Sequence, residues 1–381
     1  MGMSFERRDV NLGNWRLAPY SSWAFQNVNE VVPSAVIAGT SRAETPAKPL
    51  GKFGALPVTN VDGSQVSLAA FLEESQTDSF IVMRQGEFIA EWHAPTCDPA
   101  MPHLLFSVSK SITGILAGIL IDKGMIAETD LVSKHVPEAM ASAYGDATLR
   151  NLLDMEVALD FDENYLDKTG GFDRYRRATG WNPQDPAQPS SDLKSFLCTI
   201  QKSNAEHGVT HAYRSPNTDM VGVVLERAAG KRIPELISEL IWRPMGAHAD
   251  AFVTVDKIGT SRTAGGISAT PRDLARFGDM VRLGGRGVVS PKWIDDLWTG
   301  GSREAWRTGD QADHFPQGSY RSFWYETGIG ELAAIGIHGQ WIWIDPTTKT
   351  VVIKQSCQIL PTDAALDDTI VAMLRAVSAL T

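Results

Sequence analysis

The sequence predicts an α+β fold, in which an antiparallel sheet flanked by helices is interrupted by an inserted, mainly helical region. Alternating apolar and polar residues mark strands near both ends of the chain, at 79–94 and 331–356, and helical and loop segments separate them. We therefore expect the two ends to pair in one sheet. The expected division is a discontinuous α/β domain, residues 1–105 and 255–381, and an inserted region, residues 106–254.

The N-terminal third is expected to begin as an irregular wrap. Residues 1 to about 60 are rich in Pro, Ser, Asn and Trp without a sustained period. We expect four residues to anchor the wrap by packing: Trp15, Pro19, Trp23 and Phe25. A short helix is predicted at 66–75, and a hairpin at 79–94 turns at Gln85 and Gly86.

An apolar helix is predicted next, at 106–124. One face repeats at the spacing of a buried helix: Ile112, Ile115, Leu116, Ile119 and Leu120. Gly114 and Gly118 permit close approach of neighbours, and Gly124 ends the helix.

The remaining elements are predicted from hydrophobic periodicity and from helix-capping residues. Residues 162–191 show neither helical nor strand period and predict a long loop, a kind of segment that is usually functional or mobile. Amphipathic helices are expected at 191–202, 219–230 and 233–246. Thr270, Pro271 and Asp273 predict the start of another helix, and the last is expected at 363–380.

Composition limits the function classes. With 381 residues and 43% hydrophobic content the chain can bury a large core, and its net charge of -10 argues against nucleic acid or an anionic membrane as partner. No apolar run approaches the length of a membrane span. Three cysteines without paired spacing suggest neither a disulfide framework nor a zinc site. We expect a cytoplasmic protein; a homodimer is compatible with the sequence.

Ser107 and Lys110 carry the first chemical signal. Residues three apart share a helix face, so the hydroxyl and the amine can form a hydrogen bond. A serine becomes a nucleophile when a neighbouring base takes its proton, and a buried lysine can be that base while neutral. The alternative is a helix cap followed by a solvated lysine. Ser191 and Lys194 repeat the spacing, so the pattern alone does not decide.

Two further polar clusters follow. Tyr213, Ser215 and Asn217 lie in a predicted turn before a helix, where a tyrosine near a neutral lysine can relay a proton; the alternative is a turn tyrosine packed by its ring. His338 stands between glycines on a predicted strand, where backbone amides can stabilise an oxyanion. The alternative there is a strand kink with a partly exposed histidine.

The order of these motifs resembles a known family. SVSK, YRSPN and HGQ match in kind and order the Ser-x-x-Lys serine hydrolases, which include class C β-lactamases, penicillin-binding proteins and family VIII esterases. Longer stretches are most similar to the 6-aminohexanoate-dimer hydrolase branch: NWRLAPYSSWAFQNV, RNLLDMEVALDFDENY, YRSPNTDMVGVVLERAAG, GGISATPRDLARFG and GIHGQWIWIDP. The resemblance covers nearly the whole chain and implies a β-lactamase/penicillin-binding-protein-like fold.

The resemblance also implies roles. Ser107 would be the acylated nucleophile, Lys110 its base and Tyr213 the proton shuttle. Ser215 occupies the third position of the family's tyrosine motif, and Asn217 lies two residues further on.

A departure lies in the third motif. His338, Gly339 and Gln340 stand where β-lactamases carry Lys-Thr-Gly, which weakens the case for β-lactam hydrolysis. The resemblance implies Ser107 and Trp341 as oxyanion amides, with Gln340 as the alternative to Trp341.

The long loop supplies the remaining candidates. Tyr165 resembles the loop tyrosine that contacts the scissile amide in the nylon-oligomer branch, and the alternative is an exposed loop tyrosine. Trp181 is expected either to line the cleft or to anchor the loop. Three arginines of the loop are expected to form a solvated face: Arg174, Arg176 and Arg177. His207 and His211 lack the further ligands of a metal site and indicate a structural or turn role.

These observations predict a serine hydrolase that cleaves small amide or ester substrates through an acyl-enzyme, without a metal or organic cofactor. Three other outcomes stay open: a β-lactamase, a D-aminopeptidase, and a binding protein that retained the fold and lost turnover. Motifs of this kind fix the reaction type rather than the acyl group.

Overall fold

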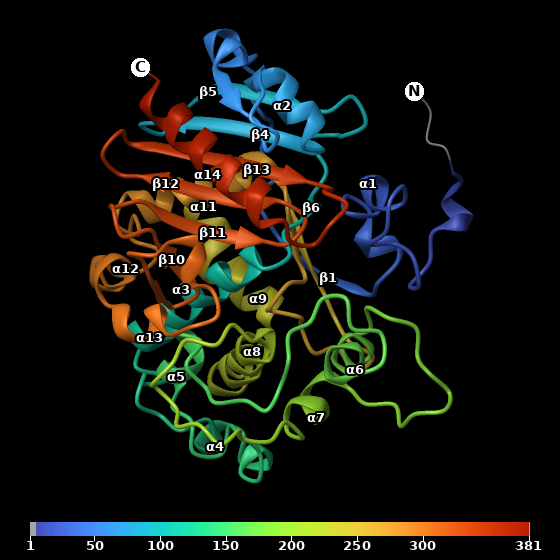
Figure 1. Ribbon diagram of the computed structural model, residues 1–381. Helices are drawn as coiled ribbons and strands as arrows, with labels where there is room; N and C mark the ends of the chain where they lie inside the picture. Colours follow the sequence, from blue (N-terminus) through green and yellow to red (C-terminus); the bar gives the residue numbers. More distant parts are fainter. Residues whose placement is uncertain (1–4, 381) are drawn as a thin grey trace.

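A seven-stranded antiparallel sheet forms the centre of the protein, which is described here by a computed structural model covering residues 5–380. The strand order is β5-β4-β13-β12-β11-β10-β9 (Figure 1). The strands are β4 (Thr77–Arg84), β5 (Glu87–His93), β9 (Ser319–Arg321), β10 (Trp324–Glu326), β11 (Leu332–Gly336), β12 (Gln340–Asp345) and β13 (Thr350–Ser356).

The pairing of the two chain ends is confirmed. β4 pairs with β13 in a register that sets Val82 opposite Val352, although 270 residues separate them along the chain. The predicted β4–β5 hairpin also forms, and both turn residues, Gln85 and Gly86, have positive φ angles. β13 is buried along its whole length because helices cover both faces of the sheet.

Two smaller sheets accompany the central one. The four-stranded sheet has the order β1-β7-β8-β6, and the third is the hairpin β2-β3. Their strands are β1 (Ser34–Ile37), β2 (Pro57–Thr59), β3 (Gln65–Ser67), β6 (His103–Leu104), β7 (Ala251–Thr254) and β8 (Ile267–Ala269).

Helices flank the central sheet and fill the region between β6 and β7. Those packed against the sheet include α2 (Leu68–Glu74), α3 (Val108–Asp122), α11 (Pro271–Arg282) and α14 (Ala364–Ala379). The intervening region contains α4 (Val132–His135), α5 (Leu149–Leu153), α6 (Gly171–Ala178), α7 (Leu193–Leu197), α8 (Ser215–Ala229), α9 (Ile233–Ile237) and α10 (Arg243–Met245). The others are α1 (Ser21–Ala24), α12 (Pro291–Thr299) and α13 (Arg303–Arg307). The expected domain boundaries stay a prediction.

Helix α3 occupies the middle of the molecule. Its residues from Val108 to Leu120 are buried, so the predicted apolar face is embedded on all sides. A Cβ atom on Gly114 would lie 2.2 Å from the Ser322 carbonyl oxygen, and one on Gly118 would overlap the Trp293 ring. The two glycines therefore allow the close packing that the sequence predicts.

Two local predictions are wrong. The segment 162–191 contains helix α6, which begins at Gly171; near its start the Asp167 carboxylate accepts hydrogen bonds from the Gly170 and Phe172 amides. Pro19 is exposed and does not anchor the wrap, whereas Trp15 and Phe25 are fully buried. The helix was missed because its apolar residues are few and it is flanked by glycines.

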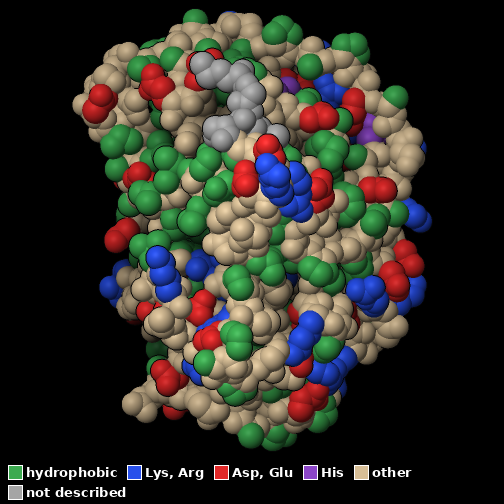
Figure 2. All heavy atoms as spheres, turned by 90° about the vertical axis from the view of Figure 1, so that its right-hand side faces the viewer, with side chains coloured by type: hydrophobic (Ala, Val, Ile, Leu, Met, Phe, Trp, Pro, Cys, Tyr) green, Lys and Arg blue, Asp and Glu red, His purple; other side chains and the backbone are tan. Residues whose placement is uncertain are grey.

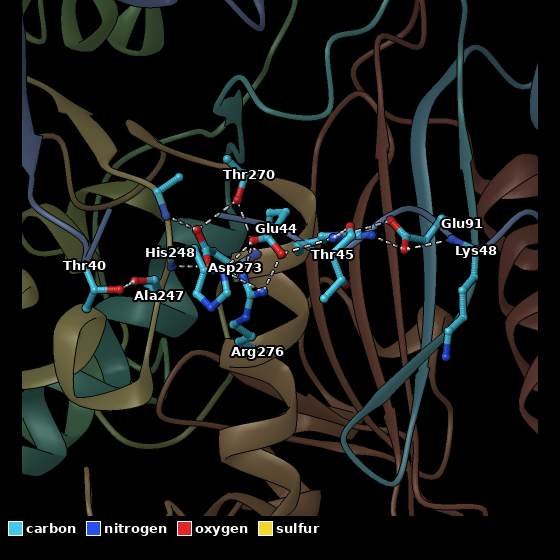
Figure 3. Close-up of polar contacts among 12 residues, drawn as sticks. Thr40, Glu44, Thr45, Lys48, Glu91, Ala247, His248, Thr270, Asp273 and Arg276 are labelled. Atoms are coloured by element: carbon cyan, nitrogen blue, oxygen red, sulfur yellow. Dashed lines mark hydrogen bonds and ion pairs between the residues drawn. The ribbon is translucent and has the colours of Figure 1, made fainter. Parts of the chain in front are cut away.

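A charged network ties residues 40–48 to the body of the protein (Figure 3). Arg272 of α11 donates to both carboxylate oxygens of Glu91 on β5, at 2.9 and 2.6 Å, and to the Thr45 carbonyl at 2.6 Å. Glu44 pairs with Arg276 at 2.7 Å. Asp273 accepts from the amides of His248 and Ala249. Residues 40–48 are thus fastened by ion pairs and hydrogen bonds, whereas Trp15 and Phe25 fasten the earlier part of the wrap by apolar packing.

Removing Arg272 is expected to destabilise this fastening. The Arg272→Met variant keeps an apolar stem against Phe88 but leaves Glu91 buried without its partner, which costs about 3 kcal/mol of unfolding free energy. Burial alone would raise the Glu91 pKa, but hydrogen bonds from His93 and Arg272 outweigh it and lower the pKa to about 2.

The Glu91 contribution is therefore present above the ordinary carboxyl pKa of 4.5 and is lost as the pH falls toward 2. Urea titrations at pH 7 and pH 3 should compare the free energy of unfolding of wild type with that of Arg272→Met. The difference in favour of wild type should be smaller at pH 3. An equal loss of stability in Arg174→Met, where the arginine is exposed, would contradict the assignment.

Across residues 5–380, no helix is long and apolar enough to cross a membrane. All three cysteines are free thiols.

Candidate active site

Ser107 and Lys110 lie in direct contact. The Lys110 amine is 2.8 Å from the Ser107 hydroxyl oxygen and donates a second hydrogen bond, at 2.7 Å, to the Ala264 carbonyl. Ser107 precedes the first residue of α3, yet its side chain caps no amide, and Lys110 is buried. The alternative reading, a capping serine with a solvated lysine, is therefore wrong.

The surroundings of Lys110 favour its neutral form. Burial lowers the pKa of Lys110 to about 7; Arg262 acts in the same direction, and Glu163 and Asp219 oppose it. A neutral amine has one lone pair. With one N–H directed at the Ala264 carbonyl, that lone pair can accept the proton of Ser107.

Tyr213 completes the cluster. Its ring lies 5.0 Å from the Lys110 amine, and the side chains of Ser107 and Tyr325 lie near enough to its hydroxyl to favour the ionised form. Burial raises the pKa of Tyr213 well above its ordinary value, and the charge of Glu163 adds to the effect, so the phenol stays protonated at neutral pH. The three residues that the sequence singles out thus meet at one point.

A carboxylate that sequence reasoning missed joins Ser215 to Tyr165. Glu163 accepts hydrogen bonds from the amide and, at 2.5 Å, from the hydroxyl of Ser215, and from the Tyr165 hydroxyl at 3.1 Å. It comes from the long loop, 52 residues before Ser215. Its one sequence signal is its place two residues before Tyr165, which does not by itself indicate a role.

A buried ion pair, also missed, holds the Ala264 segment. Asp219 of α8 pairs with Arg262 at 2.9 Å and accepts from the Ala264 amide at 2.7 Å and the Tyr175 hydroxyl at 2.5 Å. Asp219 is fully buried. Because the Ala264 carbonyl accepts from Lys110, this pair fixes the position of the lysine.

A cavity of about 730 Å³ opens beside Ser107. Five of the predicted site residues line it: Ser107, Tyr165, Trp181, Ser215 and His338. The N-terminal wrap contributes Leu12, Gly13, Asn14, Arg16 and Leu17, and that contribution was not predicted. The molecular face that carries α1 and α6, at the right of Figure 1, shows Lys and Arg side chains interspersed with hydrophobic ones (Figure 2).

His338 and Gly339 of the HGQ motif lie in a turn rather than on a strand, which corrects the prediction, whereas Gln340 is the first residue of β12. β11 ends at Gly336 and β12 begins at Gln340; His338 and Gly339 between them have φ angles of 61° and 82°. Because β12 is an interior strand, Gln340 pairs with Gly336 and Trp341 with Ile335 and Lys354.

Gly339, Gln340 and Trp341 therefore lie outside the cavity lining, and Ile337 and His338 lie in it. A Cβ atom on Gly336 would be 3.1 Å from the Ser107 amide nitrogen, so the end of β11 is the backbone that approaches the serine.

His338 and Trp181 are packed in the cavity wall. Burial lowers the pKa of His338 to about 4, and its Nδ1 lies 2.6 Å from the Gln358 carbonyl oxygen, so the ring is neutral at pH 7. The predicted strand kink with a partly exposed histidine does not occur. Trp181 donates to the Thr254 hydroxyl at 3.0 Å and faces the cavity, which joins the two roles expected for it.

The remaining predicted residues lie elsewhere or differ in exposure. Asn217 is fully buried beside the Met155 sulfur and does not reach the cavity. Arg176 lines the cavity and Arg177 is buried in an ion pair with Asp173, so the expected solvated face holds for Arg174 alone.

The two histidines considered for a metal have protein partners instead. His207 contacts the Ala158 amide and Asp146, and His211 packs against Trp306 and Tyr320. Within the described part of the chain, no three His, Cys, Asp or Glu side chains are grouped as metal ligands.

Comparison with known proteins gives consistent matches. The profile of the family described as "Beta-lactamase" matches residues 68–372. The "6-aminohexanoate-dimer hydrolase" of Paenarthrobacter ureafaciens is 38% identical over 355 residues, which are 91% of this chain and 88% of the relative.

Among solved structures, the "Putative 6-aminohexanoate-dimer hydrolase from Bacillus anthracis" superimposes with a TM-score of 0.89 at 21% identity, covering 99% of this chain and 98% of that one. "EstCE1, a hydrolase with promiscuous acyltransferase activity" gives a TM-score of 0.63 at 15% identity, with 82% and 96% covered. At these identities the two structures establish the shared α+β fold.

Proposed function

Because this chain belongs to the β-lactamase family of serine hydrolases, we propose that it hydrolyses small linear amides or esters through an acyl-enzyme formed on Ser107. The observation that carries the proposal is the contact of 2.8 Å between the Ser107 hydroxyl and a lysine whose pKa burial lowers to about 7. A relative named as a 6-aminohexanoate-dimer hydrolase supports the amide side of this range, and oligomers of that acid are candidate side substrates.

In the acylation step, Lys110 takes the Ser107 proton as the serine oxygen attacks the substrate carbonyl. Tyr213 is protonated and lies beside Ser107 and Lys110, so it can deliver a proton to the leaving amine or alcohol and recover one from Lys110. A water activated by the Lys110 and Tyr213 pair then hydrolyses the acyl-enzyme.

The oxyanion would be stabilised by the amides of Ser107 and Ile337. Within residues 5–380 neither amide donates a backbone hydrogen bond, and both residues line the cavity. Phe106 has a φ of 45°, which turns the chain into α3 just before the nucleophile. Ile337 replaces Trp341 and Gln340 in this role because they lie in the interior strand β12.

Tyr165 is proposed to help amide substrates in particular. Its hydroxyl donates to Glu163 and its side chain lines the cavity, so its oxygen can accept the N–H that an amide has and an ester lacks. We expect Tyr165→Phe to lower kcat/KM for an anilide about tenfold relative to the matching phenyl ester. Equal losses for both substrates would contradict this role.

The test of the proposed function is intact mass and peptide mapping after treatment with a fluorophosphonate. Wild type should gain one adduct on Ser107, and Ser107→Ala should gain none. Ser191→Ala is the matched control, because Ser191 has the same Ser-x-x-Lys spacing, and it should label like wild type. A separate treatment with a penicillin tests the β-lactam alternative, which the neutral His338 disfavours because it cannot hold a carboxylate as lysine does. Absence of any fluorophosphonate adduct would reject the acyl-enzyme mechanism.

A further inference from the structure

Two guanidinium groups in the cavity wall have only neutral hydrogen-bond partners. Arg16 donates to the Trp181 carbonyl at 3.0 Å and to the Asn182 side-chain oxygen. Arg176 donates to the Tyr165 carbonyl at 2.8 Å. In the described part of the chain neither forms an ion pair with a carboxylate, although the charge of Asp173 acts on both and that of Glu163 acts on Arg176.

The acidic groups nearby are already engaged. Asp173 lines the cavity, but its carboxylate pairs with Arg177 at 2.8 Å and accepts from the Asn182 amide group at 2.7 Å. Asp167 is occupied by backbone amides at the start of α6. A third guanidinium of the wall, Arg262, is neutralised by Asp219.

The cations of the wall therefore repel one another. Burial lowers the pKa of Arg16, and the charges of Arg176 and Arg262 lower it further. Burial and then Arg262 lower the pKa of Arg176 to about 10. An anion bound between Arg16 and Arg176 would relieve this repulsion.

The mouth of the cavity exposes large apolar side chains beside the ammonium group of Lys168. Four of its lining residues are large hydrophobic side chains that remain more than half exposed: Leu17 at 60%, Leu166 at 71%, Ile359 at 61% and Leu360 at 53%. Exposed apolar groups gathered around a cavity mark a binding surface for an apolar chain.

We propose that this cavity binds substrates in which a carboxylate terminates an apolar chain, with Arg16 and Arg176 holding the carboxylate. The planar guanidinium fork suits a carboxylate, and with a pKa of about 10 the Arg176 side chain is charged at pH 7. The inference rests on the proposed function, since it names the substrate class of the same site.

Only a few residue contacts separate this anion site from the nucleophile. The Trp181 ring lies 5.8 Å below the Arg16 guanidinium on one side and 5.9 Å from the Phe106 ring on the other, and Phe106 directly precedes Ser107. Arg176 holds the backbone of Tyr165, whose side chain reaches Glu163 beside Ser215. A substrate chain that passes Trp181 can place its ester or amide at Ser107.

The test compares two matched substrate pairs. In the first, the acyl chain bears the charge: the p-nitrophenyl monoester of adipic acid against p-nitrophenyl hexanoate. In the second, the leaving group bears it: 4-carboxyphenyl hexanoate against phenyl hexanoate. The measured quantity is the ratio of kcat/KM for the anionic ester to that for the neutral ester.

We expect Arg176→Gln to lower this ratio at least about tenfold in one of the pairs, because a charge-assisted hydrogen bond is lost. Arg176→Lys should restore most of the ratio, and 0.5 M NaCl should lower it in wild type. Arg174→Gln, an exposed arginine of the same helix that does not line the cavity, is the matched control and should leave the ratio unchanged. Thermal melting verifies that each variant is folded.

The two possible failures are distinct. If wild type hydrolyses neither neutral ester and Ser107 is not acylated, the proposed function is wrong. In the second case the neutral esters are hydrolysed, but in folded Arg176→Gln and Arg16→Gln the kcat/KM ratio of both pairs stays within about twofold of the wild-type ratio. The carboxylate site is then wrong and the proposed function stands.

Discussion

Turnover of esters and amides is expected to fall by roughly 10⁴- to 10⁶-fold in Ser107→Ala, to the level that binding and the oxyanion amides alone provide. The serine oxygen lies 2.8 Å from its base and has no second role as a helix cap, so its loss removes the nucleophile and little else. Initial rates with p-nitrophenyl hexanoate over a range of enzyme concentrations measure the effect.

Ser191→Ala is again the control and should retain wild-type turnover. Melting temperatures of both variants should lie close to that of wild type, because alanine fits the site of either serine. If folded Ser107→Ala kept more than about one hundredth of the wild-type kcat/KM, a different group would have to be the nucleophile.

Lys110→Met is expected to lower kcat/KM by roughly 10²- to 10⁴-fold, the usual contribution of a general base. The lysine acts while neutral and its pKa is lowered to about 7, so wild-type kcat/KM should rise with pH through about 7 and then level off. Methionine has no lone pair that can take a proton at this pH. The pH profile of kcat/KM for Lys110→Met should therefore show no ionisation near pH 7.

The same shift has a consequence for stability. The folded protein releases the Lys110 proton at a lower pH than the unfolded chain, so the unfolded chain binds more protons between pH 7 and 10.5. Through Lys110, the free energy of unfolding therefore increases with rising pH in that window. Lys194→Met changes a partly exposed lysine in the other Ser-x-x-Lys match. It should alter neither the pH profile of kcat/KM nor the pH dependence of the free energy of unfolding. If the wild-type kcat/KM instead fell as the pH rose through 7, Lys110 would be rejected as the base.

The spacing of Ser107 and Lys110 was enough to predict their contact, whereas the choice of this pair over Ser191 and Lys194 rested on the family resemblance. The contact of Ser107 with Lys110 follows from helical geometry, and the pairing of β4 with β13 follows from alternating strands at the two ends. These features depend on residues near in sequence or on patterns with a regular period. The fold class follows from the end strands and the helical patterns between them, whereas the strands of the two smaller sheets and β9 and β10 were not predicted.

Features made by distant residues were not predictable. Glu163 meets Ser215 and Arg16 meets Trp181 only after the loop and the wrap have folded against the body. The turn at 337–339 was not predicted because a hairpin turn and a continuous strand have similar alternation, and a shift of a few residues exchanges the exposed and the paired amides. Ion pairs such as Arg272 with Glu91 leave no periodic signal.

The fastening of residues 40–48 has a consequence for the order of folding. The N-terminal wrap is synthesised first, but its partners Trp181, Arg272 and Arg276 leave the ribosome much later, and β13, which pairs with β4, later still. Such sequence-distant contacts slow folding, because long loops must close before the contacts form. The cavity walls therefore cannot all be in place on the nascent chain, and substrate binding should emerge as one of the last properties that the finished protein acquires.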